Sequence, residues 1–245
     1  MTLATQQKSL IPATSPSLDG WTTDDWETPL YLGRFMQQVL ENHIVDAFCG
    51  PTSIHPKTCD FILEVGAGNG NISRFYAGDR HYYAIESKYS RISKGRQVFP
   101  RGDWMHQDFL QLDLGKLFGG CHYAVISNPP FSQAMEILEH LAAFKPLPRL
   151  MVLLLPTAFF QTEERSQRLA QLPFSITAEY RLAGRVGFIR NDIAEPNRQC
   201  NDSVFVLQPV KDSPIKIQPL NELRLDLPGK KNKRDCWDDE VPKGK

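Results

Sequence analysis

The chain contains 245 residues, of which 41% are hydrophobic and 23% are charged, and its 28 basic and 28 acidic residues give a formal net charge of zero. This composition supports a sizeable hydrophobic core and excludes wholesale disorder. A net charge of zero argues against a protein that holds nucleic acid by bulk positive charge alone, although it is compatible with a local basic face.

The two ends of the chain differ in composition from its middle. Residues 1–19 are rich in Ser, Thr, Pro and Gln, and residues 213–245 finish in a charge-dense stretch that includes KKNKR. We expect the first segment to be flexible and the second to be largely a flexible tail. Residues 20–212 are predicted to form one α/β domain.

Between these ends, short apolar runs alternate with stretches of helical periodicity. The predicted elements are a helix at 29–40, a strand at 61–65, a helix at 71–75, a strand at 81–85, a helix at 90–98, strands at 103–106 and 123–127, a helix at 133–144, a strand at 150–155, a helix at 162–172, and strands at 176–181 and 203–207. This alternation predicts a Rossmann-like α/β fold with a seven-stranded mixed sheet and helices on both faces. Only a loop separates the last two strands, so we expect them to pair in antiparallel fashion at one edge.

The cysteines and histidines form no pattern typical of a metal site. The five cysteines show no CxxC spacing and the six histidines show no HxxxH pairing. We therefore expect reduced thiols, no bound metal and a cytoplasmic location. The N-terminus lacks a signal-peptide pattern, and the longest apolar run, Leu150–Pro156, is too short to span a bilayer.

The first motif with chemical content is FILEVGAGNGNIS, at residues 61–73. An apolar strand runs into Gly66, Gly68 and Gly70 and is followed by a predicted helix, with Glu64 two residues before the first glycine. Glycines at these positions allow a sharp turn and a close approach of a ligand to the backbone. The GxGxG spacing differs from that of dinucleotide-binding loops, and it favours a nucleoside site of another kind.

Two carboxylates follow the next two predicted strands. Glu86 directly follows the strand at 81–85, in HYYAIES, where it can accept hydrogen bonds from both hydroxyls of a ribose. Asp108 follows the third strand and can accept from an adenine amino group, while the ring of Phe109 can pack on the purine. Asp113 lies close in sequence and is the alternative to Asp108.

The motif Asn128-Pro129-Pro130-Phe131 directly follows the apolar strand YAVIS. Two prolines stiffen the backbone and remove two N–H donors, so the turn displays an amide oxygen, a proline carbonyl and an aromatic ring. An amine conjugated to a ring is a poor nucleophile because its lone pair is delocalised. Two acceptors on its N–H bonds favour tetrahedral geometry and stabilise the charge that develops during attack, and Phe131 can stack on the substrate.

The motifs LEVGAGNG, AIES, QDF and NPPF, in this order, resemble the class I S-adenosylmethionine-dependent methyltransferases over about residues 26–210. NPPF is similar to the motif of enzymes that methylate amino nitrogens: adenine N6 in DNA, adenine in rRNA, or glutamine N5 in release factors. The resemblance implies S-adenosylmethionine as cofactor, with its ribose on Glu86 and its adenine amino group on Asp108. It also implies that Asn128–Phe131 hold the target amine.

The segment Thr28-Pro29 opens the first predicted helix. Thr can cap a helix and Pro suits its first turn, which leaves N–H groups for an anion such as the cofactor's methionine carboxylate. The surrounding DDWETP resembles the opening of compact phage-type adenine methyltransferases of DNA. This resemblance favours a bacterial or phage-encoded protein and DNA over RNA as partner.

Contacts to nucleic acid are expected from loops, because no separate recognition domain is visible. The best candidate is the stretch 184–202, in which Arg185, Arg190 and Arg198 suit phosphate or base-edge contacts. A solvated hairpin loop is the alternative. An adenine taken from a duplex would be flipped out and would stack on Phe131, with Phe159 and Phe160 as further stacking residues.

We expect direct in-line transfer of the methyl group to the amine held by Asn128 and the Pro129 carbonyl, without a metal or a covalent cysteine. Adenine N6 in DNA is the favoured acceptor. The alternatives are an adenine-N6 methyltransferase of RNA, a glutamine-N5 methyltransferase of a protein, and an inactive nucleic-acid-binding module. The complete motif set argues against the last of these.

Overall fold

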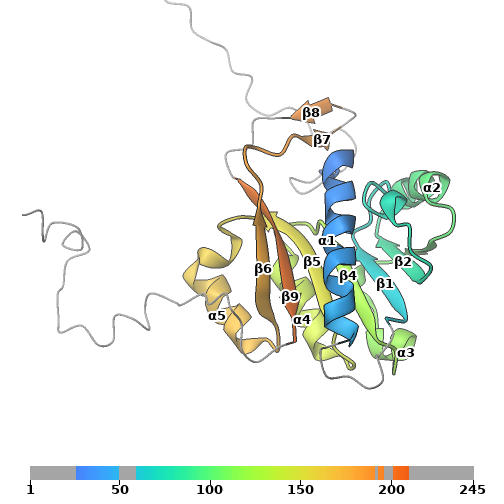
Figure 1. Ribbon diagram of the computed structural model, residues 1–245. Coiled ribbons are helices and arrows are strands. Elements are labelled where there is room, and N and C mark those ends of the chain that lie inside the picture. Colours follow the sequence, from blue (N-terminus) through green and yellow to red (C-terminus); the bar gives the residue numbers. More distant parts are fainter. Residues whose placement is uncertain (1–25, 50–58, 191–192, 196–200, 210–245) are drawn as a thin grey trace, which may run out of the picture.

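The computed structural model describes residues 26–49, 59–190, 193–195 and 201–209, and the predicted end segments 1–19 and 213–245 lie outside them (Figure 1). A seven-stranded sheet has the order β3-β2-β1-β4-β5-β9-β6. Its strands are β1 (Phe61–Val65), β2 (His81–Glu86), β3 (Asp103–His106), β4 (Tyr123–Ser127), β5 (Leu150–Pro156), β6 (Ser175–Arg181) and β9 (Asp202–Gln208). The first five are parallel, and β9 runs antiparallel to both β5 and β6. The predicted mixed sheet with a reversed last strand is confirmed.

The central strands are continuous apolar runs because both faces of the sheet are covered. All five residues of β1 and of β4 are buried. Successive side chains of a strand point to opposite faces, so Ile62 and Val152 belong to one core cluster and Leu63 and Leu153 to the other. Burial on both faces is therefore what marks these strands in the sequence.

Helices cover both faces of the sheet, as predicted. They are α1 (Leu30–Cys49), α2 (Tyr89–Val98), α3 (Leu114–Phe118), α4 (Ala134–Ala143) and α5 (Glu163–Gln171). Buried side chains of α1 and α2 join the first core cluster, whereas those of α3, α4 and α5 join the second. Figure 1 shows α1 in front of the sheet and α4 behind it.

Three local predictions differ from the structure. The helix predicted at 71–75 is only a 3₁₀ turn at Ser73–Phe75, because the backbone is already extended at Tyr76, whose N–H donates to the Ser73 carbonyl. The first helix extends to Cys49, because Ile44 and Phe48 are buried and continue the apolar face of the helix beyond residue 40. The short helix α3 was not predicted; the Asp113 carboxylate caps it by accepting from the Lys116 N–H.

The loop predicted between the last two strands contains a hairpin. Strands β7 (Phe188–Arg190) and β8 (Ile193–Glu195) pair in antiparallel fashion, and each is too short for a period-two pattern to show in the sequence. Ile189 also exchanges two backbone hydrogen bonds with Glu27, at 2.9 and 3.0 Å. The hairpin thus holds the segment that precedes α1. In the described part of the chain, no helix has the length and apolar character needed to cross a membrane.

Candidate cofactor and amine site

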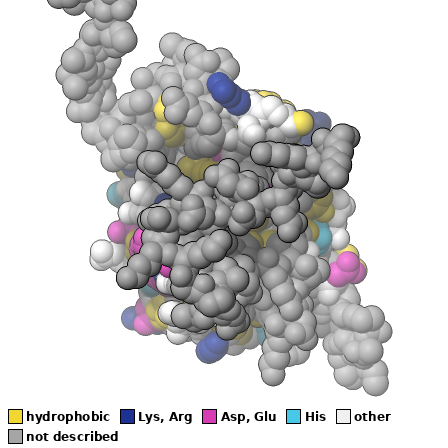
Figure 2. Space-filling view, turned by 90° about the vertical axis from the view of Figure 1, so that its left-hand side faces the viewer, with side chains coloured by type: hydrophobic (Ala, Val, Ile, Leu, Met, Phe, Trp, Pro, Cys, Tyr) yellow, Lys and Arg dark blue, Asp and Glu magenta, His cyan; other side chains and the backbone are white. Residues whose placement is uncertain are grey.

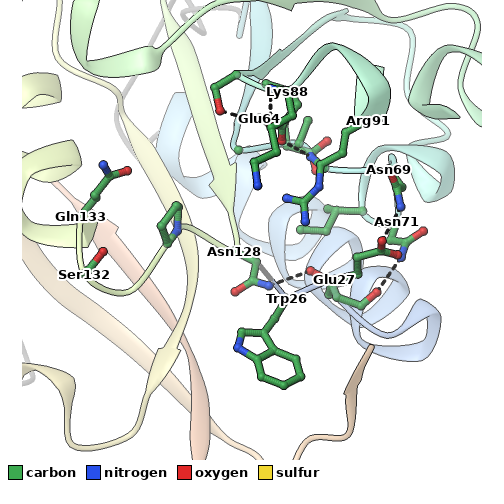
Figure 3. Close-up of a pocket in the computed structure, with 18 residues that line it drawn as sticks. Trp26, Glu27, Glu64, Asn69, Asn71, Lys88, Arg91, Asn128, Ser132 and Gln133 are labelled. Carbon is green, nitrogen blue, oxygen red and sulfur yellow. Dashed lines mark hydrogen bonds between the residues drawn. The ribbon is translucent and has the colours of Figure 1, made fainter. Parts of the chain in front are cut away.

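A cavity of about 460 Å³ opens at the carboxyl ends of β1, β2 and β4 (Figure 3). Its lining comes from residues 26–28, residues 64, 66–69, 71 and 72, residues 86–88 and 91, and residues 128, 130, 132 and 133. The carboxyl edge of parallel strands is where ligands bind in open α/β sheets, and the volume lies in the range of small-molecule sites. The predicted glycine loop, Glu86 and Asn128 are brought together here.

The glycine loop adopts backbone conformations that side chains disfavour. Gly66, Gly68 and Gly70 have φ values of 64°, 56° and 81°. A Cβ on Gly68 would meet nothing within 4 Å, so this part of the loop faces open space in the cavity. A Cβ on Gly70 would lie 2.8 Å from the Val98 side chain. Gly70 therefore serves the contact with α2, and it lies outside the cavity lining.

Glu86 is held against the glycine loop. One carboxylate oxygen accepts from the Gly68 N–H at 2.9 Å, and the other accepts from the Lys88 N–H at 2.9 Å. The residue is 5% exposed and lines the cavity. Backbone donors fix the carboxylate without neutralising it, which leaves acceptor capacity for ligand hydroxyls.

Glu64 lies deeper in the wall and is 1% exposed. Burial raises its pKa to about 8, although hydrogen bonds from Tyr82 and Ser73 act in the opposite direction. The Tyr82 hydroxyl donates to Glu64 at 2.7 Å and in turn accepts from the Gln37 side chain at 3.2 Å. At neutral pH the carboxyl therefore carries a proton, which a cationic ligand in the cavity would displace.

Asn128 is oriented by the segment before α1. Its amide Nδ2 donates to the Thr28 hydroxyl at 2.9 Å, and the Thr28 carbonyl accepts from Asn71 at 2.9 Å. Because Nδ2 is committed to Thr28, the oxygen of the amide is the atom that can accept from a ligand amine. Figure 3 shows this contact beside the indole of Trp26. The sequence did not predict this partner for Asn128.

The other residues of NPPF have separate places. Pro130 lines the cavity, and its ring lies 3.7 Å from where a Cβ on Gly66 would be. Pro129 and Phe131 lie outside the lining. The half-buried Phe131 ring packs on both core clusters and meets Phe188 edge-on at 6.4 Å. Its proposed stacking on a substrate stays a prediction.

Residues predicted after the third strand are only partly in place. Asp108 is exposed beyond the end of β3, and its carboxylate accepts from the Leu110 N–H at 3.1 Å. It lies outside the cavity lining, so its contact with a cofactor adenine stays a prediction. The Phe109 ring is 5% exposed and packs edge-on against His140 in the core, and its predicted contact with the purine stays a prediction.

Phe159 and Phe160 lie in the core, and the stacking role predicted for them stays a prediction. They are 2% and 1% exposed, and the Phe160 ring packs on Phe205 of β9 at 5.3 Å. Their apolar surface is used in the core, where Phe side chains are often fully buried.

The predicted nucleic-acid loop is described only in part. Arg185 is exposed, whereas the side chain of Arg190 and all of Arg198 lie outside the described residues.

Pro29 lies outside the cavity lining and directly precedes α1, where its carbonyl accepts from the N–H groups of Leu32 and Gly33 at 3.0 Å each. Among the described residues, no three His, Cys, Asp or Glu side chains gather as a metal site.

Several lining residues were not singled out from the sequence: Trp26, Glu27, Asn69, Asn71, Lys88, Arg91, Ser132 and Gln133. All lie within a few positions of a recognised motif. These lining residues could have been predicted from their closeness in sequence to a motif, because residues next to a strand end reach the same edge of the sheet.

The strand order, the reversed β9 and the cavity at the strand ends define the Rossmann-like fold of class I S-adenosylmethionine-dependent methyltransferases. Solved structures agree. A protein of Pyrococcus horikoshii proposed to be an RNA methyltransferase has a TM-score of 0.54 and 11% identity, over 75% of this chain and 85% of that one. The 23S rRNA methyltransferase ErmE has a TM-score of 0.52 and 11% identity, over 78% and 72%.

Sequence comparison adds a distant similarity to ribosomal RNA small subunit methyltransferase A. The protein of Phocaeicola vulgatus is 32% identical over 89 residues, which cover 35% of this chain and 32% of that protein. The protein of Thiobacillus denitrificans is 29% identical over 151 residues, which cover 60% and 54%. The match thus spans about a third to a half of these relatives. No protein-family model matches the chain.

The class implies S-adenosylmethionine as cofactor, and the cavity fits it chemically. The ligand carries two hydroxyls, a sulfonium, an ammonium and a carboxylate. The cavity offers carboxylates at Glu27, Glu64 and Glu86 for the hydroxyls and cations, and positive side chains at Lys88 and Arg91 for the carboxylate.

Proposed function

We propose that the protein transfers a methyl group from S-adenosylmethionine to the N6 amino group of adenine in nucleic acid, with RNA as the substrate. The observation that carries this proposal is the Asn128 amide. Thr28 holds it at the end of β4, on the wall of a cavity whose other groups suit the cofactor.

This chain's contribution to the reaction is positioning and electrostatics. The Asn128 oxygen accepts from one N–H of the target amine, and the Pro129 carbonyl is the proposed second acceptor. Together they favour the geometry in which the nitrogen lone pair is free to attack. The bound cofactor supplies the electrophilic methyl group. Methylation releases one proton from the amine, and when this proton passes to water no side chain has to change its charge.

RNA is preferred to DNA because the relatives with detectable sequence similarity are named for ribosomal RNA of the small subunit. The expectation of DNA from the sequence depends on Thr28-Pro29 and on the likeness to adenine methyltransferases of DNA. In the structure Thr28 contacts Asn128, and orienting the amide is a role that either nucleic acid would require. The Thr-Pro segment therefore does not favour DNA.

Transfer of a radiolabelled methyl group tests the proposal. The purified protein is incubated with labelled cofactor and with RNA, DNA or protein extract, and digested products are separated as nucleosides or amino acids. Label in N6-methylated adenosine from RNA is the expected result. Label confined to N6-methyladenine of DNA would return the substrate to DNA, and label confined to glutamine would contradict adenine as the acceptor.

Asn128→Ala should reduce transfer by at least about a hundredfold, the usual effect of removing one hydrogen-bonding group that acts on the reacting centre. The Kd for the cofactor, measured by calorimetry, should change little because Gly68 and Glu86 are untouched. Asn42→Ala is the matched control, since Asn42 is exposed on α1. An Asn128→Ala variant with near wild-type turnover would contradict the assignment.

A further inference from the structure

We infer that Trp26 forms one face of the slot for the target base, beside Asn128. This inference rests on the proposed function and adds to it the aromatic residue that receives the base. Among the described residues that line the cavity, Trp26 is the single aromatic.

The backbone on either side of Trp26 determines which way it faces. Glu27 forms an antiparallel bridge with Ile189, so the segment is extended. In extended backbone, neighbouring side chains point to opposite sides, and those two positions apart share a side. The Glu27 carboxylate accepts from Asn69 of the glycine loop, whereas the Thr28 hydroxyl accepts from Asn128. Trp26 therefore shares the side of Thr28.

The close-up view agrees with this alternation. Figure 3 shows the indole next to the Asn128 side chain, on the side of the cavity away from Glu64, Lys88 and Arg91. These three are among the charged groups suited to the cofactor, whereas Glu27 lies nearer to Trp26. A planar base whose amine meets Asn128 would thus have the indole as its nearest aromatic face.

Phe131, the ring that the NPPF motif predicts to stack, lies outside the cavity lining. It is packed against both core clusters and against Phe188, which is itself 0% exposed. Trp26 is likewise half-buried and packs on the first core cluster, but part of its surface lies in the cavity wall, which Phe131 does not line. An indole presents a larger π face than a phenyl ring, and stacking needs no hydrogen-bond pattern from the base.

The binding test uses oligoadenylate RNA with S-adenosylhomocysteine present, so it does not depend on turnover. Trp26→Ala should raise the Kd about tenfold or more, as expected for loss of one base–aromatic contact, and Trp26→Phe should recover most of the affinity. Tyr89→Ala removes an aromatic that is 66% exposed outside the cavity lining and should leave the Kd unchanged. The Kd for S-adenosylmethionine should stay near wild type in all three variants.

The outcomes separate this inference from the proposed function. A wild-type protein that binds oligoadenylate but methylates no nucleic acid would contradict the function, while the Trp26 variants would still decide the slot. An unchanged Kd for oligoadenylate in Trp26→Ala would overturn the inference, as would failure of the wild type to bind this RNA. A rise in the Kd for S-adenosylmethionine alone would place the indole over the cofactor instead.

Discussion

At the scale of single residues, the candidate site depends on how one amide is oriented. An Asn side chain carries a donor and an acceptor at similar positions, and rotation by half a turn exchanges them. In the structure Asn128 Nδ2 donates to the Thr28 hydroxyl at 2.9 Å, which leaves the amide oxygen to accept from a ligand. Thr28 thus positions the oxygen that would accept from a target amine.

Thr28→Val should lower kcat about tenfold, because the amide loses its partner and both orientations become accessible. The Kd for the cofactor should change little. Thr28→Ser retains the hydroxyl and should restore most of the activity. Single-turnover methyl transfer and calorimetry measure the two effects.

The matched control for Thr28 is Thr177→Val on β6, which removes a hydroxyl that donates to the Val206 carbonyl at 3.3 Å, far from the cavity lining. A Thr28→Val variant with normal kcat but a weakened cofactor complex would argue that Thr28 serves the cofactor rather than Asn128.

At the scale of elements, the glycine loop combines two separate demands. Gly66 and Gly68 provide an open approach to the cavity, whereas Gly70 allows the start of the following turn to lie against α2. The same motif in the sequence therefore contains a ligand-facing part and a packing part. Only the contacts with Val98 and Gly95 distinguish them.

Gly70→Ala should destabilise the fold by about 2–4 kcal/mol, because a Cβ there would combine a disfavoured φ of 81° with a 2.8 Å contact to Val98. Gly120→Ala is the control, with a φ of 87° and nothing within 4 Å of the new Cβ. It carries the backbone penalty alone, about 1 kcal/mol. Urea unfolding of both variants measures the difference; equal losses would mean that Val98 moves aside without cost.

The limits of the strands show which elements can be located from sequence patterns alone. The strands at 61–65, 103–106 and 123–127 have the predicted limits, and the others agree within one or two residues. Largely apolar runs between polar flanks mark the limits of β1 and β4 directly. The β7–β8 hairpin leaves no such mark, because its place depends on backbone pairing with Glu27 rather than on an apolar face.

At the scale of the whole molecule, the buried Glu64 links protonation to folding. Its pKa is about 8 in the folded protein, against an ordinary value of 4.5. Between these pH values the native state holds a proton that the unfolded state releases. The free energy of unfolding should therefore fall as pH rises from about 4.5 to about 8, and this contribution should level off outside that range.

Glu64→Gln should flatten this dependence, because an amide cannot ionise. The free energy of unfolding of Glu64→Gln, relative to the wild type without cofactor, should therefore increase with pH. This advantage should be small at about pH 5 and reach a few kcal/mol at about pH 9. Urea unfolding across that range measures the effect, with Glu41→Gln on the exposed side of α1 as control. Parallel curves for the wild type and Glu64→Gln would show that Glu64 ionises normally in the folded state.

The sequence by itself determined the sheet, its reversed last strand and the positions of the glycine loop, Glu86 and Asn128. These features follow from hydrophobic periodicity and from turn residues at strand ends, which are local properties. Only the tertiary structure decided the use of the aromatic residues, since Phe109, Phe159 and Phe160 are in the core while Trp26 lines the cavity. Aromatic rings suit cores and binding sites equally, and contacts between distant segments, such as Thr28 with Asn128, are not encoded in any local pattern.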